Sequence, residues 1–235
     1  MTTSAPPPDP QQALRGYFAA GTHRGRTTEA VTDALREAIL DGVLPPTTWL
    51  REDEIARTFE VSRTPVREAL RRLADDGLAT KTANHGTAVA PLSIEDILAL
   101  YVVREDLEGL AARLAATARP PGLVDELDAI SDQMRDAASG SDVPLLVRLN
   151  LEWHRSLRRA AGNTYLDRFL NQVEHAVRRL PVSTFAHPGR AEEVLAEHDA
   201  VTRAIEAGDG EAAESAASQH MHRAREIRLS VILGA

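Results

Sequence analysis

Hydrophobic residues recur with helical spacing through the first third of the chain, and prolines and glycines interrupt the pattern. Residues 28–41 carry apolar side chains at i, i+4, i+7 and i+8, which predicts an amphipathic helix. Pro45 and Pro46 favour an extended connection, and a shorter apolar pattern predicts a second helix over 51–59.

A third helix is predicted directly after a short turn at Glu60 and Val61. Ser62 suits its N-cap, and Pro65 falls in the first turn, where a missing N–H removes no intrahelical hydrogen bond. One face of this helix is apolar. The opposite face is expected to be exposed and cationic, with Arg63, Thr64, Arg67 and Arg71.

Two short extended runs follow the third helix, over 78–82 and 87–90. They flank Asn84, His85 and Gly86, which have the turn chemistry of a small hairpin. Helix, helix, turn, helix and hairpin is the order of a winged helix-turn-helix. We therefore predict such a domain over residues 27–91.

The remainder of the chain, residues 92–235, shows only helical spacing, broken by proline or glycine at several places. This pattern predicts an all-helical bundle of about six helices. Residues 1–26 contain three successive prolines and no sustained periodicity, and we expect them to form a flexible tail. The predicted fold class is therefore mainly α, with an N-terminal winged helix-turn-helix and a C-terminal all-α helical bundle.

Composition narrows the chemistry that the chain can perform. Its 235 residues suit two domains, and the absence of cysteine excludes disulfides, thiolate metal sites and cysteine nucleophiles. The N-terminus lacks the apolar region of a signal peptide, and no segment approaches the ~20 apolar residues of a membrane span. We expect a cytoplasmic protein with no membrane partner.

A net charge of −8 disfavours binding to nucleic acid for the chain as a whole, but basic residues are concentrated between Arg63 and Lys81. Arg63 and Arg67 lie one turn apart near the start of the third helix, the end that meets base edges in helix-turn-helix proteins. An arginine fork matches the O6 and N7 acceptors of guanine. We predict that these two arginines read bases, whereas His85 and Gly86 either contact DNA or form a free turn.

Three histidines are expected to face the interior of the bundle: His154, His198 and His220. Asn150 precedes the first of them by four residues, so both lie on one helix face. Imidazoles from facing helices suit a divalent metal such as Zn or Ni. His222 is predicted to point outward.

Arg104 lies within the apolar stripe of the first bundle helix, which is an unusual position for arginine. Its charge needs an anionic partner, supplied either by a neighbouring carboxylate of the protein or by an acidic ligand.

The N-terminal domain resembles the DNA-binding domain of GntR-family transcriptional regulators. The resemblance covers residues 28–91 and is most specific in VSRTPVREALRRL. It implies base reading by Arg63 and Arg67, with supporting DNA contacts from Arg51, Thr64, His85 and Gly86. Better-known relatives carry a basic residue where this chain has Asp53, which leaves the operator sequence open.

Residues 93–230 resemble the FCD ligand-sensing domain of the FadR-type subfamily, in pieces such as LNLEWHRSLRRAAGNTYL and EHDAVTRAIEAGD. The helix count is similar to that of the shorter VanR-like branch. Many members hold a metal with Asp or Asn, a histidine four residues later and two further histidines. The corresponding residues here are Asn150, His154, His198 and His220.

The expected function is therefore that of a ligand-responsive regulator, a repressor rather than an enzyme. A homodimer would bind a palindromic operator in double-stranded DNA, and a small organic acid would bind the metal and Arg104. Two alternatives remain at this stage. One is a metal-responsive repressor without an organic effector, and the other is a metallohydrolase-like bundle with an accessory DNA-binding domain.

Overall fold

The computed structural model of the protein describes residues 14–18, 27–82, 86–180 and 183–233. The chain forms two compact units, one of residues 1–93 together with 175–179 and the other of residues 94–174 and 180–235. Within the described residues, no helix is both long and apolar enough to cross a membrane.

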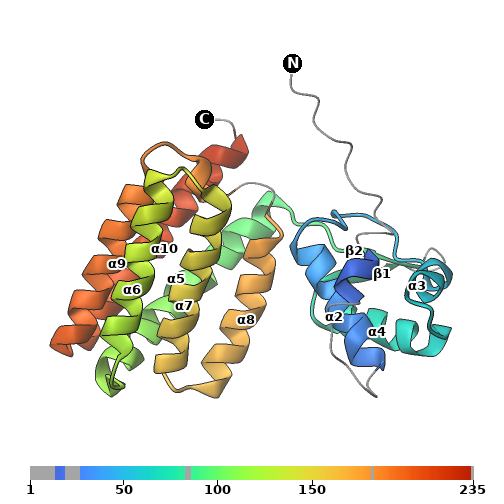
Figure 1. Ribbon diagram of the computed structural model, residues 1–235, viewed down its shortest axis with the longest axis horizontal. Coiled ribbons are helices and arrows are strands. Elements are labelled where there is room, and N and C mark those ends of the chain that lie inside the picture. Colours follow the sequence, from blue (N-terminus) through green and yellow to red (C-terminus); the bar gives the residue numbers. More distant parts are fainter. Residues whose placement is uncertain (1–13, 19–26, 83–85, 181–182, 234–235) are drawn as a thin grey trace. The chain divides into compact units, whose positions relative to one another are not determined.

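Apart from a short helical segment at residues 14–18, the described part of the first unit is built from three helices, α2 to α4, and a two-stranded sheet (Figure 1). The helices and strands are α2 (Thr27–Leu40), α3 (Glu52–Phe59), α4 (Arg63–Asp75), β1 (Ala79–Thr82) and β2 (Gly86–Val89). Their apolar faces meet in one core, where Leu35, Val66 and Leu73 are completely buried. The predicted element order is therefore present, with helix boundaries within about one residue of those expected.

The hairpin pairs antiparallel, with Ala79 opposite Val89 and Thr82 opposite Gly86. Residues 47–50 also pair with β2, through a bridge between Trp49 and Ala88 and a hydrogen bond from the Leu50 amide to the Thr87 carbonyl at 2.8 Å. The extended connection after the two prolines is thus tied to the wing.

Residues 14–18 form a short helical segment, which corrects the expectation of a flexible tail for this stretch. Leu14 is buried, and the ring of Phe18 stacks on Phe59 with 4.6 Å between the centroids. Leu14 and Phe18 pack against the apolar core of this unit. Burying these two side chains offsets the conformational entropy that is lost when the segment becomes ordered. The other tail residues lie outside the described ranges.

The second unit contains six α-helices and a short 3-10 turn among its described residues. The elements are α5 (Ile94–Ala118), α6 (Leu123–Ser139), α7 (Val143–Ala160), α8 (Thr164–Arg178), η1 (Thr184–Ala186), α9 (Arg190–Ala207) and α10 (Gly210–Leu233). The helical bundle predicted from the sequence is present (Figure 1).

Helix α5 packs closely against α10, and small residues permit this approach. A Cβ added at Gly109 would lie 2.5 Å from the Ser218 Oγ, so any larger residue would force the helices apart. The two helices run antiparallel, because Arg113 pairs with Glu214 near one end and Tyr101 meets Arg228 near the other.

The buried stripe of α5 matches only in part the helical spacing of its sequence, which predicts inward positions at Ile97, Leu100, Arg104, Leu107, Ala111 and Leu114. Leu100, Leu107 and Leu114 are only half-buried. The buried positions include three polar side chains at i, i+3 and i+7, namely Tyr101, Arg104 and Glu108. The hydrophobic pattern therefore placed this stripe too far toward the leucines, and it did not include Tyr101 or Glu108.

Candidate functional site

Helix α4 presents a cationic face to solvent. Arg63, Thr64 and Arg67 are exposed, whereas Val66 and Leu70 on the opposite face are buried. Ser62 occupies the N-cap with an extended backbone, but its side chain makes no capping hydrogen bond, contrary to the expected role of its hydroxyl. The helix is thus anchored by its apolar side, and its first turn is free to meet a partner.

The two arginines expected to read bases differ in their surroundings. The Arg63 Nε lies 2.8 Å from the Asp53 Oδ1, which joins α4 to α3, and both side chains are more than half exposed. Arg67 has no ion pair among the residues that the structure describes. Asp53 and Arg63 border a depression of about 520 Å³ at the helix-turn-helix.

The supporting positions implied by the family resemblance lie in this same unit. Arg51 is exposed immediately before α3, with its Nε 3.8 Å from the Glu54 Oε1. Gly86 begins β2 with a positive φ of 102°, a conformation that favours glycine. His85 lies outside the described residues.

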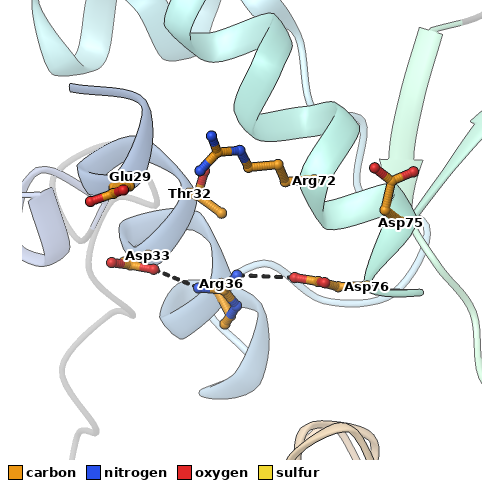
Figure 2. Close-up of a pocket in the computed structure, with 7 residues that line it drawn as sticks. All are labelled: Glu29, Thr32, Asp33, Arg36, Arg72, Asp75 and Asp76. Carbon is orange, nitrogen blue, oxygen red and sulfur yellow. Dashed lines mark hydrogen bonds and ion pairs between the residues drawn. The ribbon is translucent and has the colours of Figure 1, made fainter. Parts of the chain in front are cut away.

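A second hollow of about 280 Å³, between α2 and α4, is acidic (Figure 2). Arg36 spans it, with contacts of 2.5 Å to Asp33 and 3.0 Å to Asp76. Its lining consists of Glu29, Thr32, Asp33, Arg36, Arg72, Asp75 and Asp76. Four carboxylates outnumber two guanidiniums there, so the hollow itself disfavours phosphate.

In the helical unit, the three histidines predicted to face inward come together. His154 of α7, His198 of α9 and His220 of α10 are buried, and one ring nitrogen from each lies within 4.8 Å of the others. The Nε2 atoms of His154 and His220 are 3.4 Å apart. His222, predicted to point outward, has a side chain 51% exposed.

Two carboxylates contact the Nδ1 atoms of two of these rings, on the side away from the shared space. The Glu108 Oε2 lies 3.3 Å from the His154 Nδ1, and the Glu197 Oε2 contacts the His220 Nδ1. The first is a charge contact without hydrogen-bond geometry, and the second is a hydrogen bond. A proton held on the Nδ1 of His220 leaves its Nε2 lone pair directed at the shared space, which is the arrangement that metal-binding histidines use. Arg190 in turn holds Glu197 through two contacts of 2.8 Å.

His198 has a different environment. Its ring stacks on Trp153, with 3.8 Å between centroids, and neither ring nitrogen has a hydrogen-bond partner. Leaving such a group buried and unsatisfied costs about 1–3 kcal/mol. A divalent ion between the three rings would satisfy His198, so the residues present fit a metal.

The surroundings also set the charges of these groups. Burial lowers the pKa of His198 well below its usual value, and it lowers the pKa of His220 to about 4 despite the opposing effect of Glu197. Burial acts to raise the pKa of Glu108, but His154 and Arg104 outweigh it and hold that pKa at about 2. Two neutral imidazoles and an ionised carboxylate suit cation binding.

The remaining two predicted site residues lie beside the cluster. Asn150 is half-buried on α7, one turn before His154. Arg104 is buried, with its Nε 3.5 Å from the Glu108 Oε1 and its guanidinium 5.6 Å from the centre of the Tyr101 ring. The sequence left two possible partners for Arg104, a carboxylate of the protein and an acidic ligand. The structure contains the first of these, Glu108.

Sequence reasoning missed Glu108 as a member of this site and did not assign Glu197 to its role. Glu108 follows Arg104 by four residues, a spacing that also occurs in ordinary surface ion pairs. The useful signal was that Arg104 already faced inward, because a residue four positions later shares its face. No local pattern marks Glu197, since its partner His220 lies on another helix.

Comparison with known proteins identifies the family of each half of the chain. Residues 27–89 match the family described as bacterial regulatory proteins, gntR family, and residues 99–223 match the FCD domain. A probable D-xylose utilization operon transcriptional repressor from Paenarthrobacter nicotinovorans is 34% identical, over 83% of this chain and 87% of the relative. The transcriptional repressor RspR of Escherichia coli K12 is 28% identical, over 82% and 84% of the two chains.

The fold is also shared with a solved structure, that of E. coli McbR/YncC, with a TM-score of 0.72 and 19% identity over 88% of this chain and 98% of the other. The two sequence relatives are described as transcriptional repressors, so the metallohydrolase alternative is set aside. The chain belongs to the gntR family of bacterial transcriptional regulators and carries an FCD domain behind its winged helix-turn-helix.

Proposed function

We propose that this regulator is a cytoplasmic repressor that senses a small organic acid through a divalent metal ion, with Zn or Ni as the expected metal. The observation that carries the proposal is the cluster of His154, His198 and His220, in which two rings face carboxylates and the nitrogens of the third have no hydrogen-bond partner among the described residues. Imidazole nitrogens suit these metals.

The metal would be held by the three histidines together with Asn150. The amide oxygen of Asn150 lies on the same helix face as His154 and supplies a neutral ligand rather than a carboxylate. Such a metal supplies a positive charge to which an acid's carboxylate can bind. Arg104 would support the carboxylate from the protein side, since its contact with Glu108 is made through Nε at 3.5 Å and a guanidinium has five N–H donors.

On the DNA side, we assign base reading to Arg63 and Arg67, with Arg51, Thr64 and the wing at Gly86 contacting the backbone. The exposed cationic turn at the start of α4 supports this assignment. A homodimer would place two such helices about 34 Å apart on a palindromic operator. The dimer would have two conformations that differ in the spacing of the two DNA-binding domains. The acid would act by binding one conformation more tightly than the other.

The test is a thermal-shift screen of organic acids on the protein with and without Zn or Ni. A ligand of the folded state raises the melting temperature by mass action, so the effector should stabilise only the metal-loaded protein. Operator DNA, obtained by selection from random duplexes, should then be released when that acid is added. Release on metal addition alone would favour a metal-responsive repressor, and stabilisation by the same acid without metal would contradict the proposed role of the metal.

A further inference from the structure

One buried arginine of the helical unit lacks the counter-charge that the others have. Arg228 of α10 is 5% exposed, and its Nε lies 3.5 Å from the hydroxyl of Tyr101 on α5. Its Nη1 is buried without a hydrogen-bond partner. Within the described residues it makes no ion pair, and a buried unpaired charge is strongly unfavourable.

The other three buried arginines show what is missing. Each makes contact with at least one carboxylate: Arg104 with Glu108 at 3.5 Å, Arg158 with Glu174 at 2.9 Å and Arg190 with Glu197 at 2.8 Å. The fold can therefore supply an acidic residue to a buried guanidinium. At Arg228 it supplies only the phenol hydroxyl of Tyr101.

Arg228 lies at the opposite end of a row of buried side chains from the histidine cluster. Tyr101, Arg104 and Glu108 follow one face of α5, and Glu108 contacts His154 at the far end of that row. Tyr101 and Glu108 are about 10 Å apart along α5, and His220 and Arg228 are about 12 Å apart along α10, at 1.5 Å per residue. Both helices therefore place Arg228 two turns from the histidines, with Arg104 between.

The charges along this row do not balance. The row holds two guanidiniums and one carboxylate, that of Glu108, which contacts Arg104 and His154 but not Arg228. A divalent ion among the histidines adds two further positive charges. An acid with one carboxylate would leave Arg228 uncompensated, whereas a second carboxylate on the same molecule would pair with it.

We propose that Arg228 and Tyr101 form a second anion-binding point, and that the effector is a short-chain dicarboxylate spanning this point and the histidine cluster. The proposal rests on the proposed function, because it assumes that the first carboxylate binds at the metal. Arg228 donates to the second carboxylate, and the Tyr101 hydroxyl donates to it while accepting from the Arg228 Nε.

The test compares matched pairs of acids on the Zn-loaded protein by calorimetry: succinate with butyrate, glutarate with pentanoate and adipate with hexanoate. At least one dicarboxylate should bind about tenfold or more tightly than its partner, as expected for a charge-assisted hydrogen bond. Arg228→Met should remove this preference while leaving monocarboxylate affinity and zinc content unchanged. Arg225→Met is the matched control, because Arg225 lies on the same helix but pairs with Glu105 at 2.9 Å.

Stability without any acid gives a second readout. Arg228→Met removes an uncompensated buried charge and should raise the melting temperature of the acid-free protein, and Arg225→Met should not. Tyr101→Phe should reduce dicarboxylate preference in the same direction as Arg228→Met. A wild-type protein that binds mono- and dicarboxylates equally, or an Arg228→Met variant that keeps the preference, would overturn the second binding point. Failure of every acid to bind would overturn the proposed sensing function itself.

Discussion

The two halves of this regulator use pairs of arginine and carboxylate in opposite ways. In the winged helix-turn-helix, Arg63 and Asp53 are 67% and 54% exposed, whereas Arg104 and Glu108 in the helical unit are 9% and 7% exposed. Water screens the first pair, so its partners can exchange with other charges at little cost. The second pair is desolvated, and each member is costly to leave alone.

This difference suits the two proposed roles. An arginine that reads DNA would have to leave its protein partner to meet a base or phosphate, and an exposed pair permits that. A carboxylate that orients a histidine toward a metal would have to stay fixed, and Glu108 is buried between Arg104 and His154. In this chain, the exposed ion pair can therefore exchange its partners, whereas the buried ion pair stays fixed.

The largest expected effect concerns the interior site. Replacing His154, His198 and His220 together by alanine should abolish metal binding, because the clustered ring nitrogens are removed at once. Elemental analysis after zinc or nickel loading and dialysis measures this. His222→Ala is the control, since this exposed ring lies outside the cluster, and it should keep full metal content. Metal retained by the triple variant would contradict the site.

Removing the carboxylate charge from the buried pair and from the exposed pair should have very different effects on stability. Glu108→Gln leaves Arg104 buried without its counter-charge and should lower the free energy of unfolding by about 3–5 kcal/mol. Asp53→Asn should change it little, because that pair is exposed. Urea unfolding in the presence of a chelator separates these effects from metal binding. Equal costs for the two variants would contradict the distinction between the regions.

Much of the site was predictable because helical periodicity is a local property. The spacing of His154, His198 and His220 relative to apolar neighbours predicted that each would face inward, and the structure brings them together. The exposed arginine face of α4 followed from the same reasoning.

The unpredicted features depend on contacts between distant segments. Glu197 meets His220 and Arg228 meets Tyr101 across different helices, and no spacing within one helix reports such contacts. The pairing of Trp49 with Ala88 and the stacking of Phe18 on Phe59 are non-local in the same way. Sequence pattern therefore predicts which face a residue occupies better than it predicts the partner that it meets there.

A smaller effect is expected at the DNA surface. Arg63→Ala or Arg67→Ala should each weaken operator binding by about 1–3 kcal/mol and relax selectivity at one base position, without changing stability. Gel shifts against the selected operator and single-base variants measure this. Arg71→Ala removes a cation farther along the same exposed face and should weaken binding evenly across sequences. Unchanged selectivity after either of the first two substitutions would refute base reading by that residue.

The smallest expected effect concerns Asp53, and it tests whether the exposed pair has a role in recognition. The Asp53 carboxylate engages the Nε of Arg63, which leaves the two terminal nitrogens available for a guanine edge. Asp53→Ala should raise affinity for random DNA, since it removes a negative charge and frees a cation, and it should lower the ratio of operator to random binding. Glu54→Ala removes the same charge from the same helix but disturbs Arg51 instead, so it should raise random binding while preserving selectivity. If both variants behave alike in gel shifts at several salt concentrations, Asp53 contributes only charge, and the orientation of Arg63 must come from α4 itself.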